Sequence, residues 1–169
     1  LDSPISSHLI QKLEGSKENV TFARVDADHI NNLIEKDEVK ISKLSDEDKE
    51  KLKTEITSSI DNKSYTIQLE DLSASDAPFI ITQSEFMRRM KDMQASGGAN
   101  MFGMGNFPEM YNVVINANSD LASEILGKEN KEEKDELINQ ALDLAKLSQG
   151  LLKGKELTNF INRSFKNIK

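Results

Sequence analysis

Apolar residues recur along the chain with two different periods, and these periods separate predicted helices from predicted strands. Spacings of three and four indicate an amphipathic helix at 7–13 and another that begins after Ser45. Ser45 and Asp48 have the spacing of a capping box, in which the hydroxyl of the first residue bonds the backbone of the second. The apolar face of this helix comprises Leu52, Ile56 and Ile60.

A period of two predicts strands. Polar and apolar residues alternate at 20–25 and again at 65–69. Short apolar runs predict two further strands, at 79–81 and 111–116, and the second is rich in β-branched residues. The composition of the segment between the strands at 65–69 and 79–81 is that of a loop.

A second capping box, Thr82 with Glu85, predicts another amphipathic helix that ends at Gly97 and Gly98. Its apolar residues recur at helical spacing. The following stretch, 100–108, combines glycine with large apolar residues. Because glycine is entropically costly to order, this stretch is predicted to be a mobile apolar loop.

Three helices are predicted in the last third of the chain. Asn118 or Ser119 can cap a short helix closed by Gly127, and two longer helices follow at about 131–149 and 155–168. The apolar stripe of the first long helix comprises Leu137, Ile138, Ala141, Leu142 and Ala145. That of the second comprises Leu157, Phe160, Ile161, Phe165 and Ile168. These stripes must be buried on the chain's own sheet or on a second copy.

These elements predict an α+β fold, a small mixed α/β layer domain with a short β-sheet that ends in a two-helix hairpin. The segment 35–44 is dominated by charge and resembles a linker. We therefore expect a boundary near residue 40, which separates a first part, 1–40, from a domain at 41–169.

Composition narrows the possible classes of function. The formal charge of −7 is spread along the chain, which argues against nucleic acid as a partner. No stretch approaches the roughly 20 apolar residues that span a bilayer. The absence of cysteine excludes disulfides and fits a reducing, cytoplasmic location. The chain begins with Leu1 and lacks the pattern of a signal peptide, so we expect a piece of a longer protein.

Catalytic motifs are missing from the sequence. It contains no P-loop, no G-x-S-x-G and no H-E-x-x-H, and its histidines are His8 and His29. His29 lies near Asp26 and Asp28, but no further ligand residue is close, which favours a solvated loop over a metal site. We therefore predict no catalytic, cofactor-binding or metal-binding residue.

All six methionines lie between Met87 and Met110, interleaved with phenylalanines. Methionine is flexible and polarisable, so a methionine-rich surface can adapt to varied apolar partners. The candidate binding residues are Phe86, Met87, Met90, Met93, Met101, Phe102 and Met104. For Phe86 and Met90, packing in the core is an open alternative, whereas the loop residues are expected to be exposed.

Four stretches occur in an order and spacing that resemble the C-terminal domain of the heat-shock protein 90 chaperones, bacterial HtpG type. They are Asp76–Ile80, Phe86–Gln94, Phe107–Glu109 and Asn112–Asn118. The resemblance covers most of residues 45–169, and 1–34 resembles the end of that family's middle domain. It implies an ATP-driven chaperone that works as a homodimer, held together by a four-helix bundle of the last two helices of each subunit.

The resemblance also implies roles for particular residues. Partly unfolded client proteins would contact Phe86, Met87, Met90 and Met93, near the cleft between the subunits. The dimer interface would lie on the apolar stripes of the two last helices. Gln94 and the pair Ser119-Asp120 depart from the family pattern. ATP and magnesium bind in parts of the family that precede Leu1, so this chain is not expected to hydrolyse ATP.

Two other functions are compatible with parts of the sequence. A small enzyme would require paired carboxylates of shifted pKa in a pocket. A purely structural homo-oligomerisation domain would share the terminal helices but make no client contacts. In such a structural domain, the segment 101–107 would pack on its own subunit, whereas in a client-binding region it would be free to contact clients.

Overall fold

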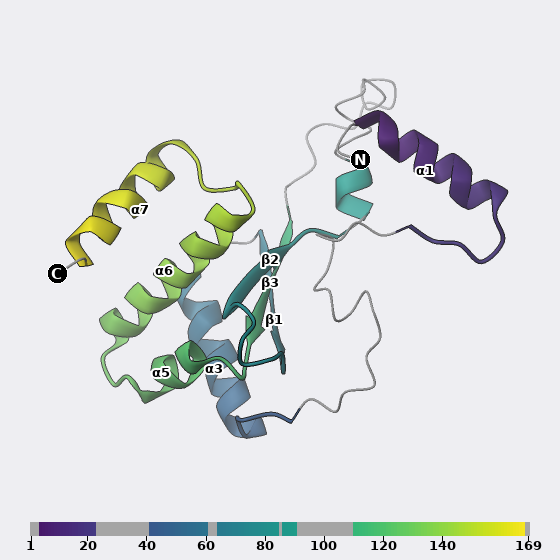
Figure 1. Cartoon of the computed structure of the whole chain (residues 1–169). Helices are drawn as coiled ribbons and strands as arrows, with labels where there is room; N and C mark the ends of the chain where they lie inside the picture. Colours follow the sequence, from purple (N-terminus) through teal and green to yellow (C-terminus); the bar gives the residue numbers. More distant parts are fainter. Residues whose placement is uncertain (1–3, 23–40, 61–63, 85, 91–109, 168–169) are drawn as a thin grey trace. The chain divides into compact units, whose positions relative to one another are not determined.

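The computed structural model describes residues 4–22, 41–60, 64–84, 86–90 and 110–167 (Figure 1). The chain divides into two compact units. Residues 1–37 and 82–112 form the first unit, and residues 38–81 and 113–169 form the second. The described residues 86–90 thus group with the N-terminal residues although they lie far from them in the sequence.

A three-stranded sheet, most of whose residues belong to the second unit, organises that unit. Its strands are β1 (Tyr65–Glu70), β2 (Phe79–Thr82) and β3 (Tyr111–Asn116), with β3 in the centre. The Ala117 amide donates to the Glu70 carbonyl at 2.9 Å, which joins matching ends of β3 and β1 and makes them parallel. The Asn116 amide donates to the Pro78 carbonyl just before β2, also at 2.9 Å, which makes β2 antiparallel to β3. The sheet is therefore mixed.

The helices of the second unit are α3 (Asp46–Ser59), α5 (Asp120–Gly127), α6 (Lys131–Ser148) and α7 (Gly154–Asn167). Figure 1 shows α3, α5 and α6 on one side of the sheet, and α3 contacts β1, α5 and α6. The core lies between these helices and the sheet, and its fully buried members include Leu52, Ile56, Ile115, Ile125 and Ile138. The hairpin of α6 and α7 ends the chain.

Helix starts in the second unit follow from local side-chain chemistry. Ser45 caps α3 as predicted: its Oγ accepts from the Asp48 amide at 3.2 Å and donates to the Asp48 carboxylate at 2.7 Å. Ser119, one of the two predicted alternatives, caps α5 by accepting from the Ala122 amide at 3.2 Å. The two long terminal helices begin and end within one residue of the predicted positions.

In the first unit, α1 (Pro4–Ser16) confirms and extends the predicted helix at 7–13. The predicted strand at 20–25 is wrong in its described part, since 20–22 have no regular structure. Asn19 adopts a positive φ of 59°, and both backbone polar groups of Phe22 bond the side chains of Glu14 and Arg89. A backbone occupied in this way cannot pair with a neighbouring strand.

The predicted capping box at Thr82 is also wrong, because Thr82 is the buried last residue of β2. Residues 86–90 are helical, and the cap is Ser84. Its hydroxyl accepts from the Met87 amide at 3.4 Å and its carbonyl accepts from the Arg88 amide at 3.1 Å. The β-branched Thr82 instead continues the strand, as threonine favours. The predicted end of this helix and the predicted loop at 100–108 lie outside the described residues.

The α+β fold class is confirmed: a small mixed sheet packs against helices, and a two-helix hairpin ends the chain. A four-helix bundle requires a second copy and stays a prediction. Among the described residues, no helix has the length and apolar character needed to cross a membrane.

Candidate functional site

The helical segment 86–90 carries the described part of the predicted client surface. Phe86 is 69% exposed, so the alternative of core packing does not hold for this residue. Met87 and Met90 are partly exposed. The other candidates, Met93, Met101, Phe102 and Met104, lie outside the described residues. The structure therefore brings three of the seven candidates onto one exposed helical turn.

The first unit also exposes apolar residues that sequence reasoning did not single out. They are Leu9 and Leu13 on α1 and Val20 and Phe22 after it. Their helical or alternating spacing suggests burial, so pattern alone could not identify them as exposed. Single exposed apolar residues are common on protein surfaces, so these four are assigned no role of their own.

A bidentate ion pair joins α1 to the helical segment 86–90. Arg89 Nη1 donates to Glu14 Oε2 at 2.8 Å, and Nη2 donates to Oε1 at 3.1 Å. Nη2 also donates to the Phe22 carbonyl at 3.2 Å, while the Phe22 amide donates to Glu14 Oε1 at 2.8 Å. These bonds lower the pKa of Glu14 from 4.5 to about 2. The bonds from Arg89 make the largest contribution and the bond from Phe22 the next, whereas partial burial acts in the opposite direction.

Acid is expected to weaken the Glu14–Arg89 contact. Because the folded-state pKa is lowered, the stabilisation is complete above pH 4.5 and is lost as the pH falls toward about 2. A tryptophan at Phe86 would report it, since the chain contains no tryptophan. Its fluorescence anisotropy should fall through this window, and Glu14→Gln should reduce the fall. Parallel curves for the two chains would contradict this prediction.

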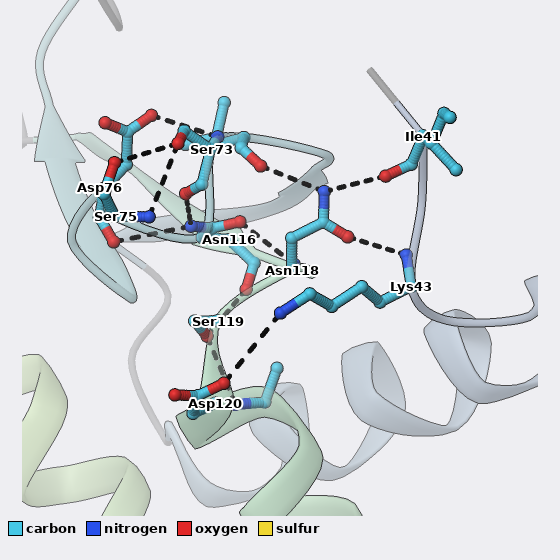
Figure 2. A network of polar contacts seen from close by, with 11 residues as sticks. Ile41, Lys43, Ser73, Ser75, Asp76, Asn116, Asn118, Ser119 and Asp120 are labelled. Carbon is cyan, nitrogen blue, oxygen red and sulfur yellow. Dashed lines mark hydrogen bonds and ion pairs between the residues drawn. The ribbon is translucent and has the colours of Figure 1, made fainter.

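Two buried asparagines, the last residue of β3 and one just after it, connect three segments of the second unit (Figure 2). Asn118 Oδ1 accepts from the Lys43 amide at 2.7 Å, and Nδ2 donates to the carbonyls of Ile41 at 3.2 Å and Leu72 at 2.9 Å. Asn116 Nδ2 donates to the Ser73 carbonyl at 2.7 Å. Asn116 Oδ1 accepts from the Asn118 amide at 3.0 Å.

This asparagine network has a structural role. Both amide hydrogens of Asn118 are used, and its side chain is buried. It attaches the chain that enters the second unit at 41–43 to the loop that follows β1. Asn116 and Asn118 belong to one of the stretches that carry the family resemblance. Their chemistry supports the fold and provides no reactive group.

The predicted dimer interface divides into buried and exposed parts. Ile138, Leu142, Ala145 and Phe160 are buried within the chain itself and leave little surface for a partner. Three residues are partly exposed: Leu137, Ala141 and Leu157. Ile161 is 42% and Phe165 68% exposed, whereas Ile168 lies outside the described residues.

Two exposed leucines of α6, Leu144 and Leu147, were missed by sequence reasoning, which assigned a single apolar face to this helix. Beside α6 lies a cleft of about 320 Å³, whose lining is mainly apolar. It is lined by Ala77, Pro78, Phe79, Leu121, Leu137, Gln140, Ala141, Leu144, Ala145 and Ser148. The exposed apolar surface of the hairpin therefore extends over both helices and is not a single stripe.

Ion pairs and glycine turns hold α6 and α7 together. Arg163 Nη2 donates to Asp143 Oδ2 at 2.7 Å, and Lys146 Nζ lies 3.4 Å from Glu156 Oε2. Gly150 and Gly154 have positive φ values of 65° and 56°, which glycine adopts without steric cost. The hairpin thus presents its exposed apolar residues on a defined scaffold.

Comparison with known proteins identifies the family of this chain. The chain belongs to the heat-shock protein 90 chaperones of HtpG type, which confirms the resemblance seen in the sequence. It is 30% identical over 235 residues to the chaperone protein HtpG of Bacteroides fragilis, a match that includes 99% of this chain. It is 34% identical over 151 residues, or 87% of the chain, to the chaperone protein HtpG of Porphyromonas gingivalis.

The chain spans about a third or less of the length of these relatives, 34% and 22% respectively. No protein-family model matches it. Within the described ranges, no group of three or more histidine, cysteine, aspartate or glutamate residues could hold a metal ion.

Proposed function

We propose that this chain is the C-terminal dimerisation and client-binding region of an ATP-dependent chaperone that assists protein folding in the cytoplasm. The exposure of Phe86, on a helical turn that also carries Met87 and Met90, is the main structural support. ATP and magnesium would be bound by parts of the parent protein outside this chain. Its own contribution would be binding rather than hydrolysis.

The chemistry of this turn suits partly unfolded proteins. A phenylalanine offers a large apolar surface, and the unbranched methionines can adopt many shapes around it. Partly unfolded chains expose apolar segments of varied sequence. A surface that adapts to its partner can bind such segments without requiring one particular sequence.

Replacement of Phe86 and Met90 by serine is expected to weaken client binding about tenfold, because apolar contact area is lost. The probe is a fluorescein-labelled globular protein kept unfolded by reduction and carboxymethylation, and its anisotropy measures the affinity. Ile41→Ser is the matched control, since it removes an apolar side chain that is 82% exposed in the second unit. Equal affinities for the wild type and the double variant would contradict a client role for this turn.

The dimer part of the proposal rests on a different surface. Ile161 and Phe165 of α7 and Leu144 and Leu147 of α6 are exposed in the single chain, and a second copy would bury them. The two parts can be tested separately. A chain that forms dimers but binds no unfolded probe would instead be a purely structural homo-oligomerisation domain.

A further inference from the structure

The bidentate contact between Arg89 and Glu14 lies within the proposed client surface. We propose that Arg89 is a positioning residue, which fixes the helical turn 86–90 against α1 and so determines how Phe86 and Met90 are presented. This inference rests on the proposed client-binding function. It adds a polar determinant to a surface so far described by its apolar residues.

The geometry favours orientation over simple attraction. The guanidinium group is planar, and two of its nitrogens are bonded to both oxygens of one carboxylate. The same guanidinium group also donates a hydrogen bond to the Phe22 carbonyl, which holds it from a second direction. A side chain held at three points restricts the rotation of its helix about the axis. Phe86 and Met90, three positions before and one after Arg89, must follow that rotation.

Solvent screens this contact only in part. The side chains of Arg89 and Glu14 are 30% and 19% exposed, whereas several other ion pairs of the chain lie at the open surface. Partial burial strengthens an ion pair of good geometry relative to an exposed one. Phe86 on the same turn remains exposed, so the contact holds the turn without covering its apolar residue.

Pre-organisation explains how a polar contact can promote apolar binding. A surface rich in flexible side chains loses conformational entropy when it binds. A turn that is already fixed in place loses less. Removal of the Arg89 contact should therefore weaken binding although Arg89 itself need not touch the client.

The test uses the full 169-residue chain with Phe86→Trp as reporter, in the variants Arg89→Gln, Glu14→Gln and the double swap Glu14→Arg with Arg89→Glu. Each single variant is expected to lower the tryptophan anisotropy and to weaken binding of the unfolded fluorescein-labelled probe roughly three- to tenfold. The swap can restore the ion pair between the two side chains but not their bonds to the Phe22 backbone, so it should recover only part of both signals.

Lys51→Gln provides the control, because it removes a cation from the exposed Lys51–Asp48 pair in the second unit. It should change neither signal. Far-UV circular dichroism should match the wild type for all variants, which separates positioning from unfolding. A general loss of structure would not be repaired by reversing the two charges.

The inference is overturned if both single variants keep the anisotropy and affinity of the parent. Failure of the reporter chain, and of the wild type, to bind the probe would reject the proposed client function. The anisotropy would then still decide whether Arg89 positions the turn. The two failures are therefore distinguishable.

Discussion

A chain with aspartate in place of Ile161 and Phe165 is expected to sediment as a monomer at concentrations where the wild type is a dimer. Both side chains are exposed on α7 and belong to the surface proposed to meet a second copy. Burying a carboxylate in an apolar interface is costly because the charge loses its hydration. Two such changes should weaken self-association by about a thousandfold or more.

The choice of these positions follows from burial. Phe160 is only 8% exposed in the single chain, so a charge there would damage the fold as well as the interface. Asn159→Asp with Asn162→Asp is the matched control, since it adds the same two charges at exposed polar positions of the same helix. Sedimentation velocity at several concentrations measures the result.

Two outcomes would contradict the dimer proposal. A wild-type chain that remains a monomer at tens of micromolar would show that the hairpin does not self-associate. A variant that still forms dimers, with the affinity of the control, would place the interface on another surface of the chain.

A large loss of stability is expected when Asn118 is replaced by aspartate. Asn118→Asp replaces the Nδ2 donor with an oxygen that faces the carbonyls of Ile41 and Leu72. Two hydrogen bonds become repulsive contacts at a buried site, and the free energy of unfolding should fall by about 3 kcal/mol. Urea denaturation followed by circular dichroism measures this difference.

Asn130→Asp is a matched control for this change. Asn130 caps α6 by accepting from the Glu132 amide at 2.8 Å, and a carboxylate can accept the same bond. The control should therefore have the stability of the wild type. Asn118→Ala leaves the carbonyls of Ile41 and Leu72 without the Asn118 donor, so this variant should also be less stable than the wild type. Equal stabilities for all four chains would show that the network contributes little.

Several elements of the fold could be predicted because their causes are local. The cap at Ser45, the apolar face of α3 and the limits of α6 and α7 depend on residues within a few positions of one another. The error at the predicted strand 20–25 occurred where a distant residue intervenes. The backbone of Phe22 bonds Arg89, which is 67 positions away, and the predicted strand therefore does not form there.

For the candidate site, as for the fold, the sequence predicted the local features but not which residues are exposed. The concentration of methionine between Met87 and Met110 is a property of composition and is visible in the sequence. The exposure of Phe86, Leu144 and Leu147 is not, because a helical period shows that residues share a face but not what covers that face. The burial of Phe160 could not be foreseen for the same reason.

The sequence by itself determined the α+β class, the positions of the main helices and strands, and the family resemblance, since each depends on local spacing and residue type. Only the tertiary structure decided which apolar residues remain exposed and how Arg89 and Asn118 join remote segments. These contacts arise when the chain folds back on itself. They depend on distances in space that the order of residues does not specify.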